Sequence, residues 1–322
     1  MSLKSLLLVA VVAAVPCTLA FGSTLDGIVT FGDSLSDAGN ASIGTLGLYP
    51  GPGYATRTVT GVPFPVGYYT TPQYGSGPSG LWVDQLSGLM GLPDPTPSLA
   101  GGSNFALASS FTNDYNAKYH APSMSAQVGG YLLSNGGHAS ATDLYTFWGG
   151  ANDIFNGLNP VLAADNIAHE IEALATAGAQ DFLWLNLPSL GDTPGLRNTA
   201  LATGANLASA AFDGEWALDL SLLKGQGIDV TGVDVNSLFN TVTGDPSAYG
   251  FTNVTTACDT TAGCDPNTAL YWDTEHPTTE ADSLVADLAY SDLNPTPESP
   301  TAILVALGIA SFALFRTRLR FA

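Results

Sequence analysis

The feature that most constrains the fold is a serine at the end of a short apolar run. Residues 27–31 are apolar or small apart from one threonine, and Gly32, Asp33 and Ser34 follow directly. A tight turn between a buried strand and a helix can leave a serine hydroxyl exposed at the edge of a parallel sheet, where α/β enzymes carry a nucleophile. The same residue types also favour ordinary turns, so the tripeptide alone leaves both interpretations open.

Two later segments carry side chains that would complement a serine nucleophile. Asp273 and His276 lie three residues apart, and Asn152 follows a glycine pair behind another apolar run. A carboxylate, an imidazole and an amide donor are groups that acyl-transfer chemistry places around a serine. Each has an ordinary alternative: Asp273 could cap a helix beginning near Pro277 with His276 on the surface, and Asn152 could form an Asx turn.

Apolar runs and helical patterns alternate along the chain. Four short runs are typical of buried strands: residues 24–31, 143–148, 181–187 and 228–235. Residues 161–177 and 198–223 have the apolar spacing of helices. Strands separated by helices predict an α/β domain whose parallel sheet is covered on both faces. Residues 50–78, rich in Gly, Pro, Tyr and Thr, are predicted to form an irregular loop at the rim of the substrate site.

With these motifs the chain resembles the GDSL esterase/lipase family, also called the SGNH hydrolases, over residues 25–292. Further segments resemble the family in the family's order: residues 80–86, 102–106, 185–194 and 245–254. The resemblance implies a single three-layer αβα domain with a central, mostly parallel sheet in a flavodoxin-like layout. It also implies a carboxylic ester hydrolase that needs neither a cofactor nor a metal.

The resemblance also assigns roles to the residues. Ser34 would attack the ester carbonyl, His276 would take its proton and pass it to the leaving alcohol, and Asp273 would orient the imidazole. The oxyanion hole would combine the Ser34 N–H, the Asn152 side chain and a third donor. The family usually has a glycine at the third position, where this chain has Ser109. A backbone N–H remains there, but the side chain could crowd the pocket or demand a different backbone angle.

The net charge of the chain limits which classes of molecule it can bind. Eight Lys and Arg stand against 28 Asp and Glu, giving a formal charge of −20, which makes nucleic acid an unsuitable partner. No calcium-binding loop of spaced Asp and Asn is present. His169, Glu170 and Glu172 are expected on a solvated helix face rather than in a metal site. The 322 residues can bury a full core, and because the motifs run from end to end, one domain is favoured.

Both ends of the chain are typical of export signals. Residues 1–20 have an early lysine, an apolar run and a small-residue cleavage site, which predicts a secretory signal peptide. Residues 294–322 combine a proline-rich linker, a short apolar helix and an arginine-rich end, and resemble a PEP-CTERM sorting signal that an exosortase removes. A plain membrane anchor is the alternative. The hydrolase domain then covers residues 21–293, at the cell surface, in the extracellular matrix or secreted.

Cysteine usage agrees with export. If Cys17 leaves with the signal peptide, Cys258 and Cys264 remain as a pair. In an oxidising compartment the expected state is a disulfide, because two cysteines without nearby histidines do not make a four-ligand metal set.

The sequence therefore predicts an exported serine esterase or lipase. Two alternatives stay open: a surface or matrix-binding protein with little turnover, and an acyltransferase that uses the same triad. Small-molecule, lipid and acylated-polysaccharide esters all remain candidate substrates.

Overall fold

The computed structural model describes residues 25–72 and 79–295. The expected signal peptide, the proline-rich linker from residue 296 and the C-terminal sorting or anchoring helix lie outside the described residues. Within the described ranges, no helix combines the length and apolar character that a membrane span requires.

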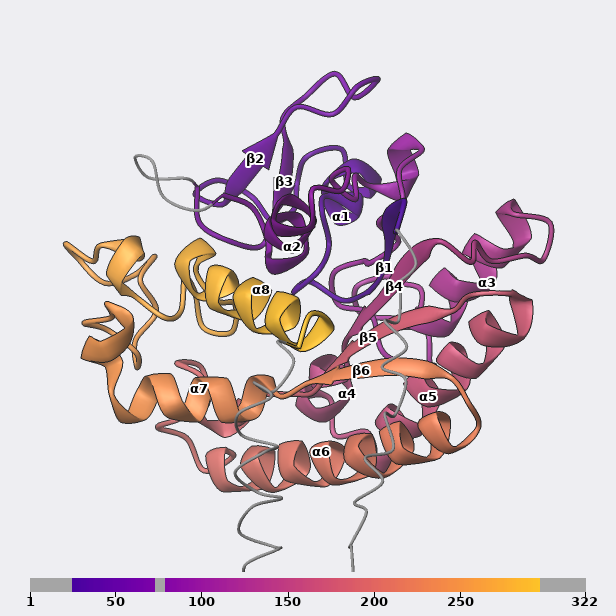
Figure 1. The fold of residues 1–322 in the computed structure, drawn as a ribbon. Helices are drawn as coiled ribbons and strands as arrows, with labels where there is room; N and C mark the ends of the chain where they lie inside the picture. Colours follow the sequence, from indigo (N-terminus) through magenta and orange to yellow (C-terminus); the bar gives the residue numbers. More distant parts are fainter. Residues whose placement is uncertain (1–24, 73–78, 296–322) are drawn as a thin grey trace, which may run out of the picture.

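A four-stranded parallel sheet forms the centre of the molecule (Figure 1). Its strands, in spatial order, are β1 (Gly27–Gly32), β4 (Asp143–Trp148), β5 (Asp181–Leu185) and β6 (Asp229–Val233). All three neighbouring pairs are parallel, which confirms the predicted sheet. The predicted strand boundaries differ from these by at most a few residues, as expected where apolar runs extend past the ladder.

A short segment extends this sheet on the outer side of β1. Thr30 and Asn104 form an isolated parallel bridge, and the N–H of Phe105 donates to the Thr30 carbonyl at 2.7 Å. Counting this segment as the second strand gives the spatial order 2-1-3-4-5, which is that of flavodoxin-like folds. The predicted layout is therefore confirmed.

Helices cover both faces of the sheet, so the domain has three layers (Figure 1). Helices α2 (Trp82–Met90) and α8 (Thr279–Leu293) pack together on one face. On the other face lie α3 (Met124–Ser134), α5 (Pro160–Ala177) and α6 (Ala202–Gly225). The last two confirm the predicted helices. Strands buried between two helical layers need apolar side chains on both faces, and the β4 residues from Leu144 to Trp148 are all buried.

Shorter elements connect these layers. They are α1 (Asn40–Gly44), α4 (Ala151–Phe155), α7 (Val235–Gly244) and the 3-10 turns η1 (Ser98–Ala100), η2 (Leu190–Asp192), η3 (Pro246–Tyr249) and η4 (Pro266–Thr268).

The segment predicted to be an irregular loop after residue 50 contains a small antiparallel sheet, which corrects that prediction. Strands β2 (Ala55–Arg57) and β3 (Val66–Tyr68) pair across three residues each. Arg57 holds the pair together, since its guanidinium lies 4.5 Å from the centre of the Tyr68 ring and pairs with Asp84 of α2. Runs of three residues are too short to show strand alternation in the sequence.

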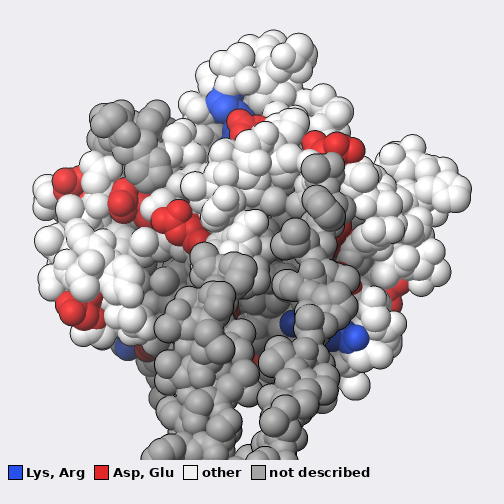
Figure 2. All heavy atoms as spheres, in the orientation of Figure 1, with Lys and Arg blue, Asp and Glu red and all other residues white. Residues whose placement is uncertain are grey.

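Basic side chains are sparse over the described residues, where Arg57, Lys118, Arg197 and Lys224 are the only Lys and Arg. Figure 2 shows acidic groups spread over the visible face, with only a few basic ones between them. No extended positive surface is available there for a polyanion.

Candidate active site

The turn after β1 presents Ser34 at the carboxyl edge of the sheet. Gly32 is required there, because a Cβ would lie 2.4 Å from the carbonyl oxygen of Trp148. The Gln127 side chain of α3 accepts from the Gly32 N–H at 3.0 Å and donates to its carbonyl at 2.8 Å. Asp33 closes the turn by accepting the Leu35 N–H at 3.0 Å. The backbone around Ser34 is therefore held on both sides, and its side chain stays partly exposed.

Asp273 and His276 lie on one turn of backbone just before α8. One Asp273 carboxylate oxygen accepts the backbone N–H groups of Glu275 and His276, at 2.8 and 2.7 Å. The other lies 2.7 Å from His276 Nδ1. The helix itself is capped by Thr278, whose hydroxyl accepts from the N–H of Ala281. Asp273 thus does not cap α8, and it holds the imidazole instead.

His276 links this turn to the serine. Its Nε2 lies 2.8 Å from Ser34 Oγ, although the two residues are 242 positions apart in the chain. The aromatic ring of Tyr69 packs against the imidazole, with ring centres 4.8 Å apart. Because Nδ1–H donates to Asp273, Nε2 is the nitrogen left to accept the serine proton. This is the hydrogen-bond order of a Ser-His-Asp triad.

Electrostatics keep Asp273 charged and make His276 more basic. Burial alone would raise the pKa of Asp273, but the imidazole and several hydrogen bonds outweigh it and lower that pKa well below its usual range. Burial alone would lower the pKa of His276, yet the adjacent Asp273 outweighs it, so the pKa of His276 lies above its ordinary value. A histidine with this bias is suited to hold a proton taken from a serine.

A second turn, between β4 and α4, places Asn152 beside the serine. Gly150 has a φ of +105° there, and a Cβ on it would lie 2.5 Å from the Phe212 ring. The Asn152 amide donates one hydrogen bond to Asp33, at 3.2 Å. Among the described residues, no acceptor takes its second N–H or the backbone N–H of Ser34, so both donors are free for an oxyanion.

Ser109 adopts a backbone conformation that glycine reaches freely. Its φ is +65°, in the left-handed region, where a side chain costs about 1 kcal/mol relative to glycine. Asp37 holds the residue before it by accepting the Ala108 N–H at 2.9 Å, and Asn116 donates to the Ser109 carbonyl at 2.8 Å. Its own N–H has no acceptor within the described part of the chain. Ser109 therefore adopts a left-handed backbone angle at the position where the resemblance implies a glycine.

A small cavity of 30 Å³ opens beside Ser34. Its lining is largely apolar and includes the following residues: Leu35, Trp148, Ala151, Phe155, Pro188, Leu190, Phe239, Tyr271 and Pro277. Polar groups enter it where Ser34, Asn152 and His276 line the same space. Ser109 does not line this cavity, so its side chain does not narrow it.

Sequence reasoning missed Tyr54. Its hydroxyl donates to the same Asp273 oxygen that holds the imidazole, at 2.6 Å, and its ring packs against Trp272 and Tyr69. The only sequence signal was the abundance of tyrosines around β2 and β3. A single tyrosine in such a segment cannot be assigned to a carboxylate 219 residues away without the fold.

Three further buried acids have raised pKa values and do not belong to the triad. Burial raises the pKa of Asp33 to about 7 and that of Asp153, which accepts from the Thr112 N–H and hydroxyl, to about 6. Glu170 was expected on a solvated helix face, and this expectation is wrong. Glu170 is only 5% exposed, accepts from the Ser125 hydroxyl at 2.5 Å, and has a pKa raised by burial to about 8.

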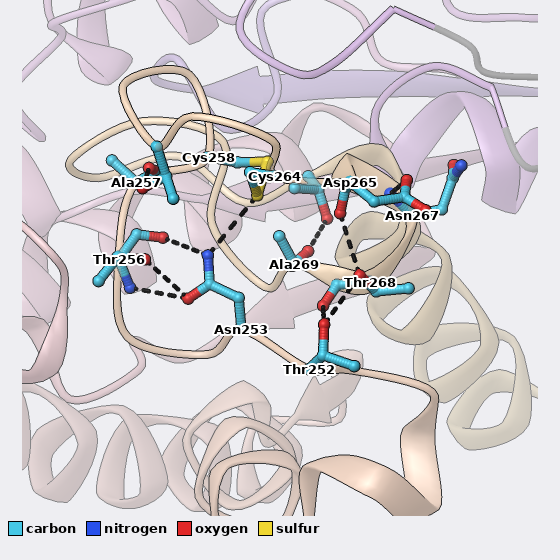
Figure 3. Close-up of a disulfide and its surroundings, with 12 residues drawn as sticks. Thr252, Asn253, Thr256, Ala257, Cys258, Cys264, Asp265, Asn267, Thr268 and Ala269 are labelled. Carbon is cyan, nitrogen blue, oxygen red and sulfur yellow. Dashed lines mark hydrogen bonds between the residues drawn. A yellow bond between two sulfur atoms is a disulfide. The ribbon is translucent and has the colours of Figure 1, made fainter.

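A disulfide joins Cys258 and Cys264 in the loop ahead of the turn that carries Asp273 and His276 (Figure 3). The Cys258 N–H donates to the Tyr271 carbonyl at 3.2 Å, and the Asp259 N–H donates to that of Trp272 at 2.8 Å. The side chain of Asn253 also donates to the Cys264 sulfur. The bridged loop thus lies against the two residues that precede Asp273.

Comparisons with known proteins identify the family that this chain matches. The model of the family described as GDSL-like Lipase/Acylhydrolase matches residues 28–289. A GDSL esterase/lipase of Arabidopsis thaliana is 27% identical, over 84% of this chain and 87% of its own length. Esterase EstA of Pseudomonas aeruginosa is also 27% identical, over 83% of this chain and 46% of its own length.

Further similarities are more distant or less informative about activity. An uncharacterised Pseudomonas putida protein is 29% identical over 87% of this chain, which spans about half (51%) of that protein. Among solved structures, a lipolytic protein of the G-D-S-L family from Veillonella parvula is 13% identical, with a TM-score of 0.47, over 84% of this chain and 99% of its own.

Proposed function

Because the chain belongs to the GDSL-like lipase/acylhydrolase family, we propose that it is a serine esterase that cleaves carboxylic esters through an acyl-enzyme intermediate. The observation that carries the proposal is the continuous chain of hydrogen bonds from Ser34 through His276 to Asp273. The names of the relatives from Arabidopsis thaliana and Pseudomonas aeruginosa support ester hydrolysis at the level of the family.

In the first half-reaction, Ser34 Oγ attacks the ester carbonyl while His276 Nε2 accepts its proton. Asp273 stabilises the resulting imidazolium through Nδ1–H. His276 then donates the proton to the leaving alcohol, and an acyl group remains on Ser34. In the second half-reaction, His276 takes a proton from water, which attacks the acyl carbon. The bond from that carbon to Ser34 Oγ then breaks, His276 returns the proton to Oγ, and the acid is released.

Negative charge that develops on the carbonyl oxygen needs hydrogen-bond donors. We assign this role to the Ser34 N–H, the Asn152 amide and the Ser109 N–H, which have donor capacity left among the described residues. Losing one donor of this kind costs roughly 100- to 1000-fold in rate. Asp33 acts indirectly by fixing the orientation of the Asn152 amide.

The size of the cavity favours a short acyl group. A buried water needs about 10–15 Å³ of such space. The 30 Å³ beside Ser34 therefore matches an acetyl or a similarly short chain better than a long fatty acyl chain. Esters of short acids, including acetylated carbohydrates, are accordingly the preferred substrate class, and a matrix polysaccharide is one such source.

The test is hydrolysis of p-nitrophenyl acetate, butyrate and octanoate by the full chain, beside Ser34→Ala. We expect kcat/KM to fall as the acyl chain lengthens, and all turnover above background to vanish in the variant. Activity that survives in Ser34→Ala would contradict the serine mechanism. Absence of turnover by folded wild-type protein on any ester would instead favour a binding role, and ester products formed with added alcohols would favour acyl transfer.

We also propose that the protein is exported, with residues 1–20 as signal peptide and residues 294–322 as a sorting signal that an exosortase processes. The disulfide between Cys258 and Cys264 supports an oxidising destination. Mass spectrometry of the mature protein from the native host tests both ends, because intact residues 1–20 in the purified protein would contradict export by cleavage.

A further inference from the structure

Three carboxylates gather between two helices on the face of the sheet that α5 and α6 cover. Asp165 projects from α5, and Glu215 and Asp219 from successive turns of α6. One oxygen from each lies within 4.8 Å of the other two. None of the three residues lines the cavity beside Ser34, so the ester hydrolysis proposed above does not account for this cluster.

Asp219 is the unusual member of this cluster. It is only 7% exposed, and its buried Oδ2 has no hydrogen-bond partner among the described residues. No described lysine or arginine forms an ion pair with it. Buried carboxylates ordinarily receive hydrogen bonds or a positive charge, since burying an unpaired charge is costly. A bound cation would supply the positive charge that the Asp219 carboxylate lacks.

We propose that Asp165, Glu215 and Asp219 together bind one divalent cation of the Ca²⁺ type. Oxygens contact Ca²⁺ at about 2.3–2.6 Å, so two ligands on opposite sides of one ion lie roughly 4.6–5.2 Å apart. The observed limit of 4.8 Å fits a single ion without moving either helix. Asp165 and Glu215 are partly exposed, which leaves room for water to complete the coordination shell.

Oxygen-only ligands select a hard cation, and zinc sites would need sulfur or imidazole. Three carboxylates on helices lack the backbone ligands of a dedicated calcium loop. We therefore expect this site to bind Ca²⁺ weakly, with a Kd of about 10⁻⁴–10⁻³ M. No linear motif predicts this site, because Asp165 and the two α6 residues come from separate helices.

Protonation is the competing way to neutralise the cluster. Burial, together with the neighbouring Asp165, Glu215 and Glu172, raises the pKa of Asp219 to about 6, and His169 opposes this effect. Cation and proton therefore compete for the same oxygen.

The test is equilibrium dialysis of calcium and thermal unfolding of the full chain, stripped with chelator and held at pH 7.5 in 150 mM NaCl. We expect one saturable Ca²⁺ per chain and a rise in Tm of about 2–6 °C at millimolar Ca²⁺. Mg²⁺ should shift Tm less, because it demands octahedral geometry and dehydrates reluctantly.

Two variants make the test specific. Asp219→Asn keeps the shape of the side chain and should abolish both the saturable ion and the Tm response, while its esterase activity reports that it is folded. Asp287→Asn, on the exposed face of α8, removes the same charge elsewhere and should leave both unchanged. Equal responses in wild type and Asp219→Asn, or no saturable binding below 10 mM Ca²⁺, would overturn the proposal.

Discussion

Asp273 and Asp219 are buried to the same degree, 8% and 7% exposed, yet the fold treats them in opposite ways. Asp273 receives two backbone N–H groups, the imidazole and the Tyr54 hydroxyl, and its pKa is lowered. Asp219 lies among other carboxylates without a described donor, and its pKa is raised to about 6. Burial alone therefore does not decide the charge of a carboxyl group, because the donors around it do.

The pKa shifts of Asp273 and Asp219 also make the stability of the fold depend on pH in opposite directions. The lowered pKa of Asp273 stabilises the fold above its unfolded pKa of about 3.9, and this contribution is lost as the pH falls through the folded value. The raised pKa of Asp219 stabilises the fold below about 3.9, and that contribution is lost as the pH rises through about 6.

The largest expected effect comes from removing the charge of Asp273, the carboxylate of this pair that receives hydrogen bonds. Asp273→Asn should lower kcat by about 10,000-fold, because an amide no longer holds the imidazole in the productive tautomer. Steady-state kinetics on p-nitrophenyl acetate measure it. Asp259→Asn, exposed on the disulfide loop, removes one nearby charge as a control and should change kcat little. A similar loss in both variants would refute the specific role of Asp273.

Glu170 is an intermediate case between Asp273 and Asp219, because this buried acid has a single described hydrogen-bond donor, the Ser125 hydroxyl. Its folded pKa of about 8 means that stability is lost as the pH rises from about 4 through 8. Glu170→Gln keeps the acceptor for Ser125 and should stabilise the protein at pH 9 but not at pH 4, by up to roughly 5 kcal/mol at about 1.4 kcal/mol per pKa unit.

Urea unfolding at both pH values measures this difference. Glu172→Gln, two residues along the same helix and only partly buried, removes the same charge and serves as the control. A pH-independent effect of Glu170→Gln would mean that its gain comes from packing rather than from charge.

Tyr54→Phe should have a smaller effect, because it removes one donor from Asp273 and leaves the others. We expect kcat to fall about tenfold, the equivalent of one hydrogen bond to a charged group. With less competition for Asp273, the pKa of His276 should rise further, so the acid limb of the kcat/KM profile should move to higher pH. Tyr69→Phe is the matched control, since the Tyr69 hydroxyl has no described partner. An unchanged acid limb in Tyr54→Phe would show that Tyr54 only packs.

Much of this molecule could be predicted from local sequence. Strands of the parallel sheet and helix α5 are visible as apolar runs and spacings, because burial on both faces leaves a continuous signal. Ser34, Asn152, Asp273 and His276 each sit on a short motif next to a strand or a turn, but their roles came from the resemblance of several such motifs to one family.

The remaining features depend on contacts between distant residues. Tyr54 acquires its partner only when β2 is folded against the turn before α8, and Glu170 is buried only because α3 packs on α5. Likewise, the positive φ of Ser109 follows from how Asp37 and Asn116 hold its neighbours, which no local preference of serine indicates.

The most direct test of the account is covalent labelling with a fluorophosphonate, followed by intact-mass analysis and peptide mapping. We predict one adduct per chain, located on Ser34, and labelling slowed at least about 100-fold in His276→Ala, since the imidazole is the general base. Ser34→Ala should not react. An adduct on another residue, or equal labelling rates in wild type and His276→Ala, would contradict the claim that His276 activates Ser34 as the nucleophile.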